Sequence, residues 1–205
     1  MMMSPAQQQE RRRQLIAITV DIARRGGYDA VQMRAVADGA DVAVGTVYRY
    51  FPSKQCLLLS ALESELERLE RVARPASSSA GDCYQQLWHV ISHLNADMTH
   101  DSRLAEAMAR AFMLSYISGG ADCDRVRRRL DAMFALPLGG GDEPTGAQRK
   151  LACLVVDSWV SNAISWLHRR ATTADINDRL WHLLAVLARR DGLVGPMPNQ
   201  PDFFA

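Results

Sequence analysis

Side chains suited to phosphate oxygens and base edges gather between residues 44 and 54. Tyr48 and Arg49 supply a phenol hydroxyl and a guanidinium that can meet phosphates. Thr46 offers a hydroxyl to a base edge and a methyl group to thymine, and Gly45 lets the backbone approach a nucleic acid closely. The pattern predicts duplex DNA as a partner. The candidate DNA-contacting residues are Arg34, Val44, Gly45, Thr46, Tyr48, Arg49, Tyr50 and Lys54.

A helix-turn-helix would present these side chains, and residues 34–54 have its pattern. Asp41 falls at the turn, where Asp tolerates left-handed geometry. Pro52 ends the second helix, expected at about 44–50, and Ser53 is expected to cap the next helix. The cation Lys54 opposes that helix's dipole, so an external anion explains it better than helix stability. The apolar stripe consists of Val36, Ala37, Ala40, Val42 and Val47.

The segment Gly-Thr-Val-Tyr-Arg-Tyr-Phe-Pro-Ser-Lys at 45–54 resembles the signature of TetR-family transcriptional repressors. Two positions depart from it: Asp41 replaces a turn glycine, and Ala43 replaces a Ser or Thr cap at a local cost of about 1 kcal/mol. Residues 26–38 resemble the KstR-type branch, which regulates sterol (cholesterol) catabolism in actinobacteria. Further similar stretches lie near 104–112, 130–134 and 157–170. The resemblance implies a repressor whose inducer is the coenzyme A thioester of a sterol side-chain acid.

Composition agrees with an intracellular regulator. The 205 residues are 48% apolar, enough for a sizeable core. Residues 1–54 hold eight Arg or Lys and five acidic residues, a net charge of +3, so the remainder carries −2 of the total of +1. The basic end is thus the helix-turn-helix end. We find no bilayer-spanning run and no signal-peptide core, and the four cysteines are scattered, so we expect a cytoplasmic protein with reduced thiols.

Helical periodicity predicts an all-α fold. We expect residues 1–54 to form a DNA-binding domain and residues 55–205 a helical effector-binding and dimerisation domain. Pro75–Gly81 reads as a linker, and the tail from Asp191 as irregular. Helices are expected from about Gln8 to Gly26-Gly27, where glycine ends the helix, and at about 53–74, 82–99, 103–118, 121–136, 145–170 and 173–190.

The last two of these helices are apolar on more than one face, which is typical of a helix shared between a core and a partner. We therefore expect a homodimer built from this pair, and the family resemblance implies a four-helix interface. A two-fold dimer matches a palindromic operator. The predicted interface residues are Val156, Val160, Ile164, Leu167, Leu180, Leu184 and Leu187.

An effector pocket is expected among large, adaptable side chains with few charges, which suit a hydrophobic small molecule. Any one of these taken alone is more often a core residue than a ligand wall. The predicted lining consists of Met98, Leu104, Met108, Phe112, Tyr116, Trp159 and Trp166, with Ser115, Tyr116 and Asn162 as its polar members. If the effector is a sterol acyl-CoA, the run Arg125, Arg127, Arg128 and Arg129 is a candidate for its phosphates, although a solvated helix face explains that run better.

Other functions fit the sequence less well. His89 and His93 are spaced for one metal ion, but no third ligand is evident. No nucleophile motif is present, so we expect no catalysis, metal or cofactor. Within regulation, the alternatives are a repressor of an efflux or fatty-acid operon, responding to a drug or a simple acyl-CoA, and an activator. A helical binding protein with a vestigial helix-turn-helix is the alternative from another class.

Overall fold

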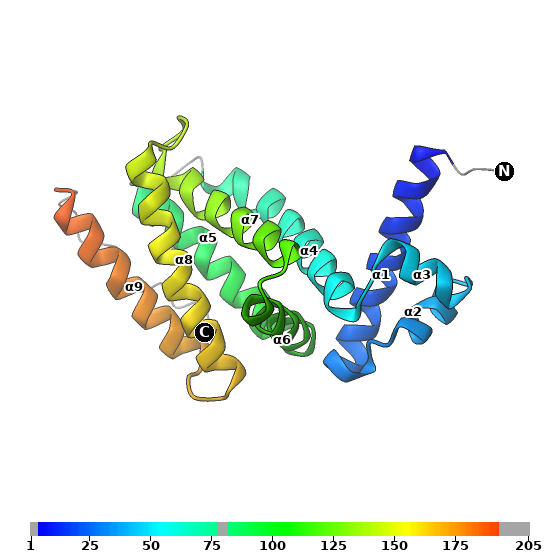
Figure 1. Ribbon diagram of the computed structural model, residues 1–205. Helices are drawn as coiled ribbons and strands as arrows, with labels where there is room; N and C mark the ends of the chain where they lie inside the picture. Colours follow the sequence, from blue (N-terminus) through cyan, green and yellow to red (C-terminus); the bar gives the residue numbers. More distant parts are fainter. Residues whose placement is uncertain (1–3, 78–81, 193–205) are drawn as a thin grey trace. The chain divides into compact units, whose positions relative to one another are not determined.

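The computed structural model describes residues 4–77 and 82–192, and within these ranges the chain forms nine α-helices and no strand (Figure 1). The all-α prediction is confirmed. The helices are α1 (Pro5–Ala30), α2 (Met33–Gly39), α3 (Val44–Tyr50), α4 (Lys54–Ser77), α5 (Cys83–His100), α6 (Ser102–Ser118), α7 (Ala121–Leu138), α8 (Gly146–Leu167) and α9 (Thr173–Arg190).

Helix α1 is longer than predicted at both ends. Ser4 and Gln7 form a capping box, in which the Ser4 hydroxyl accepts from the Gln7 N–H at 3.2 Å and the Gln7 side chain accepts from the Ser4 N–H at 2.8 Å. Gly27 has φ +69°, so the predicted stop is a kink after which helical turns resume to Ala30. The kink needs glycine because its φ lies in the left-handed region.

The other helix bounds lie close to the predicted ones because strong local signals mark them. Ser53 caps α4 as predicted, accepting from the Cys56 N–H at 3.1 Å. Helix α4 continues to Ser77, so residues 75–77 are helical rather than part of a linker. The rest of the predicted linker, residues 78–81, and the tail from residue 193 lie outside the described residues.

The chain packs as two units. Unit 1 comprises Met1–Glu67 and Met98–Arg127, and unit 2 comprises Arg68–Asp97 and Arg128–Ala205. This packing differs from the predicted division at residues 54 and 55, because α6 and the first turns of α4 pack with the N-terminal helices. The packing therefore does not divide at residue 54. That DNA is bound by residues 1–54 and the effector by residues 55–205 stays a prediction.

Unit 1 has one continuous core, which we call the head core, and α6 is part of it. Leu15 of α1, Val47 of α3 and Phe51 are each fully buried in it. Helix α6 contributes an apolar stripe to the same core and packs against α1, so a helix from far along the chain supports the helix that carries the helix-turn-helix. That stripe consists of Leu104, Ala107, Met108 and Ala111.

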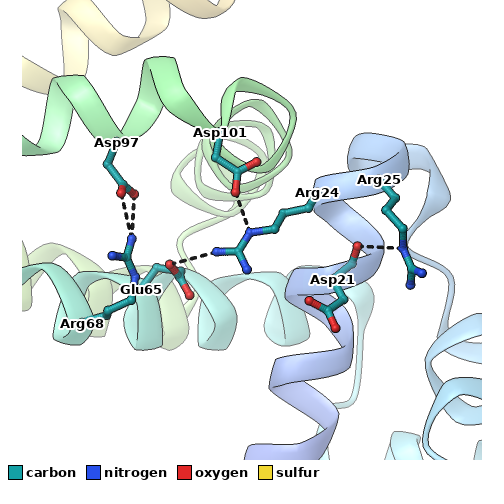
Figure 2. A network of polar contacts seen from close by, with 7 residues as sticks. All are labelled: Asp21, Arg24, Arg25, Glu65, Arg68, Asp97 and Asp101. Carbon is teal, nitrogen blue, oxygen red and sulfur yellow. Dashed lines mark hydrogen bonds and ion pairs between the residues drawn. The ribbon is translucent and has the colours of Figure 1, made fainter.

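Charged side chains reinforce the packing of α6 within unit 1. Arg24 of α1 reaches Asp101 at the start of α6, with 2.5 Å between Nε and Oδ2, and its Nη2 lies 3.7 Å from Glu65 of α4 (Figure 2). Arg103 of α6 donates to the carbonyl oxygen of Arg25 at 2.8 Å. These side chains are partly exposed, so each contact is worth well under about 1 kcal/mol. Together they fix where α6 begins against α1.

Unit 2 combines an apolar core with a buried polar cluster. Helices α8 and α9 run side by side (Figure 1). The Trp159 indole donates to Asn95 at 2.9 Å, and the Asn95 amide donates to Asn177 at 2.7 Å. Asn95 and Asn177 are buried, and such groups are tolerated there because their hydrogen bonds are satisfied. These hydrogen bonds form in only one alignment of α5, α8 and α9, so the cluster fixes how the three helices pack.

The structure corrects part of the predicted dimer face. Val156, Leu180 and Leu184 are fully buried inside unit 2, so they belong to its own core and present no surface to a partner. A helix that is apolar all round does not reveal in sequence which of its faces is internal. Val160, Ile164, Leu167 and Leu187 are half-buried and stay candidates for the interface.

Among residues 4–77 and 82–192, no helix combines the length and the apolar character that a bilayer-crossing segment requires.

Candidate nucleic-acid interface

The turn between α2 and α3 has the geometry predicted from Asp41. This residue has φ +52°, in the left-handed region that Asp adopts more readily than most residues. The chain reverses there, with the Val42 N–H donating to Ala37 at 3.0 Å and the Asp41 N–H to Asp38 at 3.3 Å. Ala43 then begins α3 without a side-chain cap, as its residue type requires. The turn thus sets the angle between the two helices.

Helix α3 has one buried side and one free side. Val47 is fully buried in the head core and anchors the helix. Val44 is 41% exposed and Tyr48 is 51% exposed, a large apolar and aromatic area for so short a helix. A methyl group added at Gly45 would meet no other atom within 4 Å, so the space beside that residue is open. The free side is therefore available to a partner.

The remaining predicted contact residues all lie in unit 1. Arg49 is exposed, with its guanidinium carbon 5.4 Å from the centre of the Tyr50 ring. Arg34 is exposed at the start of α2, whereas Thr46 and Tyr50 are half-buried. Together with Val44, Gly45 and Tyr48, these residues place hydrogen-bond donors and positive charges on the short helices α2 and α3, which are held by the head core.

The three arginines near the start of α1 have different roles. Arg12 lies 5.0 Å from the centre of the buried Phe51 ring and donates to the Ser60 hydroxyl at 3.0 Å, so it holds α1 to α4. Arg11 donates to Gln14 at 2.9 Å, and Arg13 lies 3.7 Å from Glu10. Both are local helix-surface contacts, which leave Arg11 and Arg13 near solvent.

Lys54 is held by an aromatic ring. Its Nζ lies 3.8 Å from the centre of the Tyr28 ring, and the guanidinium carbon of Arg110 lies 4.4 Å from the same centre. Arg110 also pairs with Asp29 at 3.4 Å. Burial lowers the pKa of Lys54 below its usual value; Asp29 opposes this change and Arg110 adds to it. Lys54 thus lies just beyond α3, the predicted recognition helix, with its ammonium on an aromatic face.

The predicted effector residues do not form one lining in unit 1. Leu104 and Met108 are buried in the head core, and their place in a pocket lining stays a prediction. Phe112 is buried, with its ring 5.9 Å from that of the exposed Tyr116. Met98 is half-buried. The predicted residues Trp159, Asn162 and Trp166 lie in unit 2, where Asn162 accepts from Arg179 at 3.2 Å.

Ser115 is the predicted polar residue that does face a cavity described within unit 1. This cavity has a volume of about 370 Å³. Cys56 lies in its wall beside Asp122, and burial, followed by the hydrogen bond and charge of Asp122, raises the thiol pKa to about 12. The lining mixes polar and apolar groups, as small-molecule sites do. It consists of Ser53, Gln55, Cys56, Leu59, Leu114, Ser115, Ser118, Gly120 and Asp122.

Two family models cover most of the chain. Residues 15–61 match the model of bacterial regulatory proteins of the tetR family, and residues 81–187 match the tetracyclin repressor-like C-terminal domain. The chain belongs to the TetR family. It is 46% identical over 173 residues to the HTH-type transcriptional repressor KstR of Mycolicibacterium smegmatis, covering 84% of each chain. The KstR repressor of Mycobacterium tuberculosis is 44% identical, over 84% of this chain and 78% of that one.

Solved TetR-family structures share the fold. A TetR transcriptional regulator from Rhodococcus sp. RHA1 superposes with a TM-score of 0.75 at 24% identity, covering 88% of this chain and 97% of that one. FadR of Thermus thermophilus, a TetR-family repressor in complex with lauroyl-CoA, superposes with a TM-score of 0.69 at 17% identity, covering 85% and 93%. The chain is thus a KstR-like transcriptional repressor of the TetR family, and its curated relatives are named as regulators rather than enzymes.

The other sites considered in the sequence have structural explanations in this TetR-family chain. The rings of His89 and His93 lie 4.4 Å apart edge to face, and among the described residues no group of three metal-ligating side chains forms. Arg125 pairs with Asp122 at 2.6 Å, and Arg129 pairs with Glu70 at 3.0 Å. These two arginines are neutralised within their own units, which favours the helix-surface explanation for the run.

Two residues near Lys54 were missed by the sequence reasoning. Tyr28 lay within the stretch that resembles the KstR-type branch, but an aromatic residue at a helix end gives no signal of what it touches. Arg110 lies more than fifty positions from Lys54 along the chain and meets the Tyr28 ring only because α6 packs on α1. Only the tertiary structure could have brought these side chains together.

Proposed function

We propose that this KstR-like repressor controls genes of sterol or other lipid catabolism. In this proposal it binds a palindromic operator as a homodimer in the cytoplasm and leaves it when a hydrophobic effector binds, with a sterol-derived acyl-CoA as the first candidate. The observation that carries the proposal is the identity of 46% with a KstR repressor over 84% of both chains. The free side of α3 supports the DNA contact, because Val44 and Tyr48 are exposed there.

The dimer is proposed to form through α8 and α9. Leu154 is 65% exposed on α8, and Val186 is 61% exposed on α9. Exposing aliphatic side chains of this size to water is unfavourable, so their burial against a partner would stabilise a dimer. Val160, Ile164, Leu167 and Leu187 supply the half-buried remainder of the face. Leu154→Glu together with Val186→Glu should give a monomer by sedimentation and abolish cooperative operator binding. A variant pair that stays dimeric would rule out this face.

The effector is proposed to act through helices that also carry the DNA-binding head. Ser115 and the cavity near the start of α4 support a ligand contact in unit 1, where Met98, Phe112 and Tyr116 are further candidates. Trp159, Asn162 and Trp166 are the candidates in unit 2. An acyl-CoA is supported by the fold of the FadR repressor, whose structure contains lauroyl-CoA. A two-state dimer explains release, because a ligand that prefers the state with mismatched recognition helices lowers DNA affinity.

Fluorescence anisotropy on DNA from upstream of the protein's own gene tests the proposal. The complex is titrated with a 3-oxo-sterol CoA thioester, with lauroyl-CoA and with free coenzyme A, and random duplex is the reference DNA. Release by the sterol thioester alone supports the sterol branch. Release by lauroyl-CoA at lower concentration favours a fatty-acid operon, and failure to prefer the upstream DNA over random duplex refutes operator binding at that site.

Tyr48→Ala provides a matched variant for the same assay. Tyr48 is 51% exposed, so its loss should leave folding intact while weakening binding to both DNAs. Ile117→Ala, at a residue that is 80% exposed on α6, is the control and should bind as the unchanged protein does. Equal binding by the two variants would remove Tyr48 from the interface.

A further inference from the structure

Tyr28 lies within the DNA-binding head, and its ring contacts the cation that follows the recognition helix. It lies at the end of α1, just past the kink at Gly27, and its ring contacts Lys54 at 3.8 Å and Arg110 at 4.4 Å. Lys54 is the first residue of α4, four positions after α3 ends. One aromatic side chain thus meets a cation from α4 and a cation from α6.

The contact leaves the donors of Lys54 available. A Lys ammonium carries three N–H donors, and an ion pair would direct them to a carboxylate. Among the described residues no carboxylate pairs with Lys54, while an aromatic face attracts the charge without accepting strong hydrogen bonds. The ring therefore restrains the ammonium and leaves it able to donate to another acceptor.

The charges around the Tyr28 ring leave a net positive charge for an external anion. Arg110 brings a second positive charge to the same ring, and Asp29, which lies 3.4 Å from Arg110 and is 83% exposed, attracts both cations. A phosphate oxygen that approaches Lys54 therefore meets two cations and a single solvent-exposed carboxylate, and the attraction exceeds the repulsion. A surface held in this way is prepared to accept the DNA backbone.

We propose that Tyr28 is a positioning residue for a phosphate contact made by Lys54. The proposal rests on the DNA-binding function above and adds to it a residue that need not touch DNA itself. A free Lys side chain loses much conformational freedom when it is fixed on a phosphate. The Tyr28 ring removes part of that loss beforehand, and preorganisation of this kind strengthens binding without a new contact.

A double-mutant cycle between Tyr28 and Lys54 tests the proposal. Operator and random-duplex affinities are measured by anisotropy over a range of salt concentrations for the full chain, Tyr28→Leu, Tyr28→Phe, Lys54→Gln and Tyr28→Leu/Lys54→Gln. Lys54→Gln removes one phosphate contact from each protomer, so for the dimer it should reduce the slope of log affinity against log salt by about 1.8, the value of two phosphate contacts. Tyr28→Leu should weaken binding roughly 3- to 10-fold, and Tyr28→Phe, which keeps the ring, by less than about 2-fold.

The coupling separates positioning from a folding defect. In the Lys54→Gln background, Tyr28→Leu should have almost no further effect, because the side chain that it positions is absent. An equal loss in both backgrounds overturns the proposal, and so does an unchanged salt slope for Lys54→Gln. If the full chain does not prefer its operator, the proposed operator recognition is refuted. The phosphate contact of Lys54 is then still tested by the salt dependence of binding to random duplex.

Discussion

Replacing Met108 by Ala is expected to destabilise the DNA-binding head although Met108 lies in the half of the chain predicted to bind the effector. Met108 is 4% exposed within the head core. The deleted atoms contribute about 2 kcal/mol of transfer free energy, and the cavity that remains adds about 1 kcal/mol. A loss of about 3 kcal/mol is a large part of the roughly 5–15 kcal/mol that stabilises a typical domain.

Urea denaturation followed by circular dichroism measures this loss, and amide hydrogen exchange in α1 and α3 locates it. The four tryptophans, at 88, 159, 166 and 181, belong to unit 2, so their fluorescence reports that unit instead. Ile117→Ala on the same helix, at a side chain that is 80% exposed, should change stability by less than about 0.5 kcal/mol.

One result would refute the packing argument. If Met108→Ala keeps the stability of the unchanged protein and loses only its response to an effector, Met108 is a ligand wall rather than a core residue. Faster hydrogen exchange in α1 and α3, with effector response retained below the melting temperature, agrees with the structure.

Three further predictions concern single groups. Asp41→Val should lower the free energy of unfolding by about 1–2 kcal/mol while Asp41→Gly should not, because φ is +52° there; equal denaturation midpoints would contradict this. The thiol pKa of Cys56 is raised to about 12, so at pH 8 the thiol should react with iodoacetamide more slowly in the folded protein than in the unfolded protein. Its contribution to stability should fall between about pH 9 and 12, because the thiol of the unfolded chain loses its proton first. Burial, and then the charge of His93, lowers the pKa of His89, so stability should fall as the pH drops below about 6.5, where the ring binds a proton first in the unfolded chain. His89→Phe should flatten this dependence of the melting temperature on pH.

The helix-turn-helix could be predicted from sequence because its signals are local. Pro52 stops one helix, Ser53 caps the next, and Asp41 takes the left-handed turn, and each of these acts within a few residues of itself. Gly27 was predicted to end the first helix, which is wrong, because the helix kinks there and resumes to Ala30. Where a residue's own backbone preference decides the structure, the sequence is sufficient.

Residues decided by distant packing could not be assigned in this way. Leu104 and Met108 have the spacing of a buried stripe, and nothing in that spacing separates a pocket wall from the head core. Val156 and Leu154 lie two positions apart on α8, yet one is fully buried and the other is 65% exposed. A helix apolar on several faces gives both side chains the same pattern, so only the packed neighbours distinguish them.

The place of α6 in the head core has a consequence for how the protein is made and redesigned. Synthesis proceeds from the N-terminus, so α1, α2 and α3 are complete well before Leu104 and Ala111 leave the ribosome, and until then the head core lacks the side that α6 supplies. A chimaera joined after residue 54 would likewise set Leu15 and the rest of the buried side of α1 against an α6 from another parent. Exchange of DNA specificity between relatives therefore requires α6 to travel with the recognition helix, or its stripe to be rebuilt to match.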